Sequence, residues 1–153
     1  MSHNIIKDYS QRVGYNEEEM TKLEEGRHRF RHIKALSKAS QIYTIQVEVV
    51  DSKHCNTGYK VGDKFILDVD GNLISKLNPK RLCVYLVSQM IIPVALINER
   101  LSEGLEPDNF HFMHYLRCPD VGVQCLGYGE VKASITVVPR TFRRTMSSET
   151  FIP

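Results

Sequence analysis

The chain has 153 residues, of which 42% are hydrophobic, and a formal net charge of +2. This size and composition suit one globular domain with its own core. A charge so near zero excludes a strong electrostatic attraction to nucleic acid or to a membrane surface.

The sequence also lacks the usual signals for export or membrane insertion. Its first residues, MSHNIIKDYSQ, contain no apolar stretch of the secretory kind. The longest apolar run, residues 82–97, is interrupted by polar residues and Pro93, and is shorter than the roughly 20 residues of a spanning helix. We therefore expect a cytoplasmic protein, in which cysteines are more often thiols, metal ligands or redox groups than structural disulfides.

The N-terminal part of the chain predicts a helical arm. Residues 1–15 show no regular pattern, and we expect them to be irregular. Asn16 followed by Glu19 is typical of a capping box, which begins a helix. An amphipathic helix should continue to about Ser37, with a basic second half that suits a helix C-terminus. We interpret residues 1–40 as an arm that is either simply solvated or docks on a partner.

Alternating apolar and polar residues predict strands at 43–50 and 64–69. A loop that contains Cys55 lies between them. After the second strand, Asp70-Gly71 is a strong hairpin signal, because glycine takes the positive φ that such turns require. A short third strand should begin at Asn72.

The next segment predicts a buried helix. Pro79 is expected at its first position, where the missing N–H costs nothing. Residues 82–101 are apolar nearly all round, which is typical of a helix inside the core. Pro93 should kink or divide it. Cys83 would lie within a turn of the helix start, where the helix dipole favours the thiolate.

Further strands are predicted at 110–116 and 131–138, with a Cys-Pro-Asp turn between them. The elements together predict an α+β fold: a small antiparallel sheet, a buried helix on one face and an appended N-terminal amphipathic helix. We assign the cysteine-containing domain to residues 41–139 and a C-terminal tail to residues 140–153.

Three motifs occur together between residues 42 and 138: HC-x2-GYKVGD, a cysteine that opens an apolar helix, and a Cys-Pro-Asp turn. This combination resembles a family of small uncharacterised prokaryotic proteins. The matching positions are His54, Cys55, Gly58, Tyr59, Lys60, Gly62, Asp63, Cys83, Cys118, Pro119 and Asp120. The resemblance implies a fold and three recurring cysteines, and it implies no reaction. Cys125 lies outside the family pattern.

The cysteines are candidate metal ligands. Their spacing contains no CxxC pair, which excludes an ordinary zinc finger, but ligands from separate segments can converge in space. Four thiolates, or three with one histidine, suit zinc or an iron–sulfur cluster. The candidate ligands are Cys55, Cys83, Cys118 and Cys125, with His54, His111 and His114 as additional donors. Unligated thiols packed in the core, or a disulfide or redox pair, are the alternatives.

A catalytic cysteine is a separate possibility. His54 and Cys55 are sequence neighbours, and neighbours on an extended chain point to opposite faces, which argues against them as a pair. Cys118 with His111 or His114 is an equal candidate. Other polar residues that could line or shape a cleft are Tyr59, Lys60, Asp63 and Asp120.

The leading hypothesis is an accessory or small subunit that binds a metal or iron–sulfur cluster through its cysteines. It would associate with a larger enzyme, or with copies of itself, through the N-terminal helix and the C-terminal tail. The alternatives are a small cysteine-dependent enzyme and a metal-free oligomeric scaffold or ligand-binding module whose cysteines are core residues. Neither charge nor aromatic placement indicates nucleic-acid binding.

Overall fold

A computed structural model describes residues 2–140, and the side chains from residue 5 onward. Four strands form one antiparallel sheet in the order β2-β1-β4-β3. The strands are β1 (Tyr43–Lys53), β2 (Lys64–Leu67), β3 (Tyr115–Arg117) and β4 (Glu130–Pro139). The helices are α1 (Ser2–Val13), α2 (Glu17–Glu25), α3 (Arg27–Ile42), α4 (Val84–Ser88) and α5 (Ile91–Ser102), with 3-10 turns η1 (Ser75–Leu77) and η2 (Val123–Cys125). The predicted α+β class is confirmed.

The central strand β1 organises the sheet. Val47 on β1 lies opposite Phe65 on β2 and Ile135 on β4, and all three side chains are fully buried. Successive side chains of a strand point to opposite faces, so the apolar alternation places one complete face in the core. The predicted strands at 43–50 and 131–138 are therefore confirmed. β1 also continues past a register shift between Val49 and Asp51 to reach the cysteine loop.

Helices α4 and α5 cover the apolar face of the sheet through Leu86, Met90 and Ile97, which are buried. The predicted helix start at Pro79 was wrong, because α4 begins only at Val84. Before it, the Asn78 side chain accepts from the N–H of Ile66 and donates to its carbonyl, each at 2.8 Å, so it completes the hydrogen bonds of β2.

The division between α4 and α5 falls before the predicted proline. α4 ends at Ser88 and α5 begins at Ile91, so Pro93 lies in the first turn of α5, where its missing N–H is tolerated. The expectation of burial all round was also wrong. Ile91 and Ile92 are exposed, because only one face of the helices contacts the sheet and the opposite face is uncovered.

The stretch Val84–Ser102, which contains α4 and α5, is long and apolar enough to cross a membrane by length and composition alone. The stretch spans 19 residues, more than the interrupted apolar run suggested. Core helices of globular domains meet the same test. About one third of the apolar window is buried, which matches a helix with one face against a sheet.

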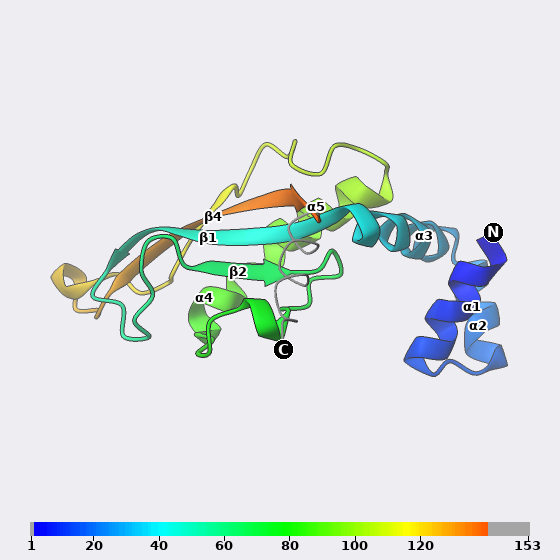
Figure 1. The fold of residues 1–153 in the computed structure, drawn as a ribbon, viewed down its shortest axis with the longest axis horizontal. Helices are drawn as coiled ribbons and strands as arrows, with labels where there is room; N and C mark the ends of the chain where they lie inside the picture. Colours follow the sequence, from blue (N-terminus) through cyan, green and yellow to red (C-terminus); the bar gives the residue numbers. More distant parts are fainter. Residues whose placement is uncertain (1, 141–153) are drawn as a thin grey trace, which may run out of the picture.

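The N-terminal arm differs from its prediction in two places. Residues 2–13 form α1 rather than an irregular segment, and its Ile6 is buried at 1% exposure. Its apolar residues recur at helical spacing, a pattern that the prediction of an irregular segment overlooked, and α1 contacts α3. The long predicted helix is divided at Gly26 into α2 and α3. Figure 1 shows α1 and α2 together at the far end of the molecule, joined to the sheet by α3.

The capping box at Asn16 is confirmed. The Asn16 side chain accepts from the Glu19 N–H at 2.9 Å, and the Glu19 carboxylate accepts from the Asn16 N–H at 2.9 Å. These reciprocal bonds satisfy two N–H groups that the first turn of a helix leaves unpaired. This local signal set the start of α2 correctly.

Several predicted strands are shorter in the structure. β2 ends at Leu67, and the expected third strand is only a bridge between Leu67 and Leu73. The turn between them has Gly71 at φ +89, as the hairpin signal required. Of the strand predicted at 110–116, only its end forms β3. The C-terminal tail from residue 141 lies outside the described residues.

Candidate functional site

Three cysteines line one pocket of about 810 Å³ at the end of the sheet away from α1 and α2. Cys55 comes from the loop after β1, Cys83 immediately precedes α4, and Cys118 immediately follows β3. All three are partly buried, and all are free thiols. The fold therefore brings together three thiols that are well separated in the sequence.

Tyr59 forms the support beneath Cys83. Its hydroxyl donates to the Arg81 carbonyl at 2.9 Å and accepts from the Cys83 N–H at 2.7 Å. Its ring packs edge-on against Phe65, with 5.1 Å between the centroids. Burial raises the pKa of Tyr59, so the hydroxyl keeps its proton at neutral pH. Tyr59 was predicted to line a cleft, whereas it is buried behind the pocket wall and is not part of the lining.

We expect Tyr59→Phe to lower the free energy of unfolding by about 1–3 kcal/mol, because it leaves the Cys83 N–H and the Arg81 carbonyl without their partner. Urea unfolding measures this loss. Tyr128→Phe is the matched control, since Tyr128 is 78% exposed and its change should cost almost nothing. Equal stability of the two variants would contradict the supporting role.

The Cys83 sulfur lies in surroundings that favour the thiolate. Burial raises the pKa of Cys83, but interaction with the Leu86 N–H, the Thr57 hydroxyl and the Tyr85 N–H outweighs it, and the net pKa is lowered. The position of Cys83 directly before α4 agrees with the sequence prediction. The thiolate form of a cysteine, rather than the thiol, is the form that binds metal ions and acts as a nucleophile.

We expect iodoacetamide to alkylate Cys83 of the folded chain with a half-maximal rate at a lower pH than Cys83 of the urea-unfolded chain, because the folded surroundings lower its pKa. The lowered pKa has a second consequence. The folded chain binds the Cys83 proton more weakly than the unfolded chain does, so the fold gains stability above the ordinary cysteine pKa. This gain in stability is lost as the pH falls through the lowered pKa. Peptide mapping by mass spectrometry across a pH series measures both rates. A Cys83 pH profile that is the same in the folded and the unfolded chain would refute the lowered pKa.

Asp120 organises the opposite wall of the pocket. Its carboxylate accepts from the N–H groups of Gly129 at 2.9 Å, Tyr128 at 3.0 Å and Gly122 at 3.1 Å. These bonds, chiefly those from Gly129 and Tyr128, lower the pKa of Asp120. The oxygen atoms of the carboxylate are thus already hydrogen-bonded to the N–H groups of its own loop, which leaves the carboxylate poorly placed to act as a base or a metal ligand.

The two walls meet through a close backbone contact. A Cβ atom added at Gly129 would lie 2.4 Å from the carbonyl oxygen of His54. Only glycine allows this approach, which fixes the cysteine loop against the segment after η2. The sequence around Gly129 gives no sign of this contact, because the contact is with a segment distant along the chain.

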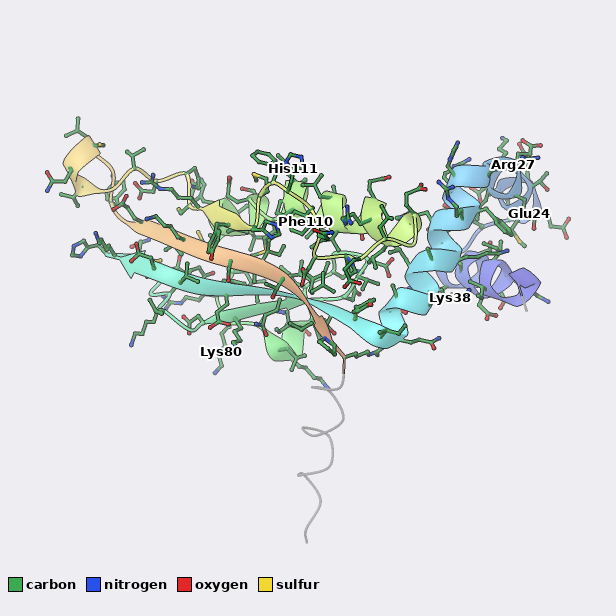
Figure 2. All side chains as sticks on the ribbon, turned by 90° about the horizontal axis from the view of Figure 1, so that it is seen from above. Glu24, Arg27, Lys38, Lys80, Phe110 and His111 are labelled. Carbon is green, nitrogen blue, oxygen red and sulfur yellow. The ribbon has the colours of Figure 1, made fainter. Side chains whose placement is uncertain are left out.

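The other predicted site residues lie outside the pocket. His54 is exposed with φ +52, and Lys60 is exposed. Asp63 accepts from the Lys60 N–H at 2.8 Å and so caps its own loop. His111 is exposed beside Phe110 in Figure 2. His114 stacks on the Phe110 ring and hydrogen-bonds to its carbonyl.

Several pocket residues had no signal in the sequence. The mouth includes Val84 and Tyr85 from α4 and Tyr128 from the opposite loop, all of them largely exposed. Thr57, also in the lining, lies within the turn that follows Cys55, which a 3.0 Å hydrogen bond from the Gly58 N–H to the Cys55 carbonyl closes. The sequence identifies each of these residue types, but only the tertiary structure brings the residues together at one pocket.

The pocket therefore offers three soft sulfur donors beside an apolar mouth. Within residues 2–140, no three side chains of His, Cys, Asp or Glu stand close enough together to hold a metal ion as they are placed. No histidine lines the pocket in this part of the chain. Among the described residues the lining thus offers a cysteine no histidine as a base, and its sulfur atoms would have to approach one another to share an ion.

Comparison of the chain with protein-family models, with curated proteins and with solved structures gives no match. The resemblance to the family with three recurring cysteines therefore stays a prediction.

Proposed function

We propose that the protein binds a soft metal ion or an iron–sulfur cluster through Cys55, Cys83 and Cys118. The observation that carries the proposal is that these thiols, from three separate segments, line one pocket. Thiolate sulfur is the preferred ligand of zinc, copper(I) and iron–sulfur clusters. The free state of the thiols agrees with a reducing compartment, and we place the protein in the cytoplasm.

Metal binding at this pocket would require the cysteine side chains to rotate, while the backbone that carries them stays in place. The backbone at Cys118 is held by a 2.9 Å hydrogen bond from its N–H to the Val131 carbonyl, and that at Cys83 by Tyr59. Rotation about the Cα–Cβ bond moves a cysteine sulfur while the backbone stays in place. Each thiol would lose a proton on binding, for which the lowered pKa of Cys83 is favourable.

We also propose that the protein works as a subunit of a larger assembly. The outer face of α4 and α5 exposes Val84, Tyr85, Ile91 and Ile92, each more than half exposed. Exposed apolar patches of this kind mark protein interfaces. The pocket opens at one end of this face, because Val84 and Tyr85 belong to both.

The test is binding of Zn²⁺ under anaerobic conditions, measured by competition with a chromophoric chelator. Cys55, Cys83 and Cys118 should each be changed to serine in a separate variant. Each change should weaken zinc binding by more than roughly 10–100-fold, which is the typical loss when a residue that only positions a metal ligand is removed. His111→Ala is the control, because His111 is exposed and does not line the pocket. Unchanged affinity in all three serine variants would overturn the proposal.

A second candidate function, a small cysteine-dependent enzyme, draws on the lowered pKa of Cys83 alone. It requires a base beside the thiol, and the described pocket contains no histidine. It would be favoured if Cys83 formed a stable adduct with a substrate-like electrophile while the Cys55 and Cys118 variants retained full reactivity.

A further inference from the structure

Two of the three pocket thiols come from segments that contact each other. Cys55 begins a turn over residues 55–58, which a 3.0 Å hydrogen bond from the Gly58 N–H to the Cys55 carbonyl closes. Thr57 lies in this turn, and its hydroxyl interacts with the Cys83 sulfur. Because Thr57 follows Cys55 by two residues, their Cα atoms are no more than about 7 Å apart. The Cys55 turn therefore lies directly beside the Cys83 thiol.

Tyr59 joins the same two segments through its hydroxyl. It directly follows the Cys55 turn, donates to the Arg81 carbonyl at 2.9 Å and accepts from the Cys83 N–H at 2.7 Å. Burial raises the pKa of Tyr59, and negative charge on the Cys83 and Cys55 sulfurs raises it further. Electrostatic interactions weaken with distance, so both sulfurs lie near this hydroxyl. Cys55 and Cys83 thus lie on adjoining segments, whereas Cys118 comes from the segment after β3.

The surroundings of Cys55 and Cys83 suit thiol–disulfide exchange. Both cysteines are partly buried against the core, and both line the pocket of about 810 Å³, so a small molecule can reach them. Exchange proceeds by attack of one sulfur on a disulfide, and a second thiol completes it without a separate histidine base. The lack of a histidine in the lining described for residues 2–140 is therefore no obstacle to this reaction.

The mouth of the pocket indicates what kind of disulfide would enter. Val84, Tyr85 and Tyr128 are 68%, 66% and 78% exposed, and they form an apolar and aromatic entrance. Cys83 directly precedes Val84 and is thus the thiol that an entering molecule meets first. Among the described lining residues Asp120 alone is charged, and its carboxylate is hydrogen-bonded to its own loop. An uncharged disulfide with aromatic or other apolar substituents fits these surroundings best.

We propose that Cys83 and Cys55 form a redox dithiol that reduces small disulfides with aromatic or apolar substituents. The Cys83 thiolate attacks one sulfur of the substrate, which gives a mixed disulfide and releases the first substrate thiolate. The Cys55 thiol then loses its proton to solvent and attacks the Cys83 sulfur, which gives the Cys55–Cys83 disulfide and releases the second thiolate. The two cysteine sulfurs are oxidised and the two substrate sulfurs are reduced, so the electrons balance.

The Cys55–Cys83 disulfide has structural and chemical consequences. Its formation draws the Cys55 turn against the start of α4, because a disulfide joins residues whose Cα atoms are about 4–7 Å apart. A small thiol in excess restores the dithiol by the reverse exchange, and disulfides in cytoplasmic proteins are usually transient in this way. The disulfide uses two of the proposed metal ligands, so it excludes metal binding, but the exchange itself requires no metal.

The neutral aromatic disulfide 4,4′-dithiodipyridine is the probe, added at one equivalent per chain with a metal chelator present. The full chain with Cys125→Ser is the reference, because Cys125 is exposed, lies outside the pocket and would consume the probe. Each probe molecule should release two molecules of thiopyridone, which absorbance measures. Peptide mapping without reduction should find Cys55 joined to Cys83.

Two further changes, each made in the reference chain, separate the roles of the two thiols. Cys55→Ser should release one thiopyridone per probe and keep the other half on Cys83 as a mixed disulfide, seen by mass spectrometry. Cys83→Ser should slow the release by roughly tenfold or more, because the first attacking thiol is lost. Alanine in place of serine repeats either test should a variant fold poorly by circular dichroism.

A charged probe tests the substrate class. The dianion 5,5′-dithiobis(2-nitrobenzoate) should react with the reference chain roughly tenfold or more slowly than the neutral probe, because the pocket offers its carboxylates no cation. Each rate is divided by that of the same probe with the urea-unfolded chain, which removes the difference in intrinsic reactivity. Equal normalised rates would refute the assigned substrate class.

Two outcomes would overturn the dithiol itself. Release of one thiopyridone per probe from the reference chain, with the mixed disulfide persisting, would show that no second thiol reaches Cys83. A disulfide that maps to Cys118 instead of Cys55 would refute the assigned pair. Because the chelator removes metal, either outcome leaves the proposed metal site standing, and failure to bind zinc leaves the dithiol standing.

Discussion

Gly129→Ala is expected to disrupt the candidate pocket and to lower the free energy of unfolding by about 3 kcal/mol or more. The added methyl carbon would lie 2.4 Å from the His54 carbonyl oxygen and 2.8 Å from its carbonyl carbon. Both contacts are to backbone, so no side chain can rotate away to relieve them. The walls that carry Cys55 and Cys118 would have to separate.

Urea unfolding and zinc affinity, measured on the same preparation, check this result. Gly104→Ala is the matched control, because no atom lies within 4 Å of a Cβ there and its φ of +69 is the only source of strain. We expect the control to lose about 1–2 kcal/mol and to keep full zinc affinity. A Gly129→Ala variant no less stable than the control would show that the two walls do not contact as described.

Phe65→Ala is expected to remove about 3–5 kcal/mol of stability. Phe65 is fully buried, lies opposite Val47 in the sheet and packs edge-on against Tyr59 behind the pocket. Truncating it leaves a cavity in the core and removes the support of the Tyr59 ring. The loss would take a large part of the 5–15 kcal/mol that typically separates folded from unfolded chains.

Thermal and chemical unfolding of Phe65→Ala should be compared with those of Val61→Ala, in the loop before β2. Val61 is 66% exposed, and its truncation should change stability by less than about 0.5 kcal/mol. A cost below about 1 kcal/mol for Phe65→Ala would mean that the site relaxes around the cavity, and that Phe65 is not central to the core.

Local signals in the sequence predicted much of the sheet. The alternation is regular over residues 45–49 of β1 and 131–135 of β4, because one face of each strand is buried there and the other is not. The capping box at Asn16 also depends only on neighbouring residues, and it was located correctly. In both cases the interaction that fixes the structure is encoded within a few positions.

Tertiary context decided the elements that were predicted wrongly. α1 is the exception, because its own apolar residues recur at helical spacing and this pattern was overlooked; α1 also contacts α3. The apolar character of α4 and α5 suggested burial on all sides, but apolar residues also occur on surfaces that bind partners. A single sequence gives no direct means to distinguish a core face from an interface face.

The candidate site was predicted in part. The spacing of the cysteines did not determine whether they converge in space. The structure places Cys55, Cys83 and Cys118 around one pocket. The roles of Tyr59 and Gly129 could not be read from the chain, because each depends on a contact with a distant segment. The histidines suggested as donors lie outside the pocket, since residue type alone does not determine position.

X-ray absorption spectroscopy of protein purified without oxygen, after its metal, iron and sulfide content is measured, tests the metal site most directly. Bound zinc should show a shell of sulfur neighbours at about 2.3 Å. Iron accompanied by sulfide should show iron–sulfur and iron–iron distances of a cluster. A chain that carries no metal and takes up none on reconstitution, or a metal surrounded only by nitrogen and oxygen, would contradict a site built from Cys55, Cys83 and Cys118.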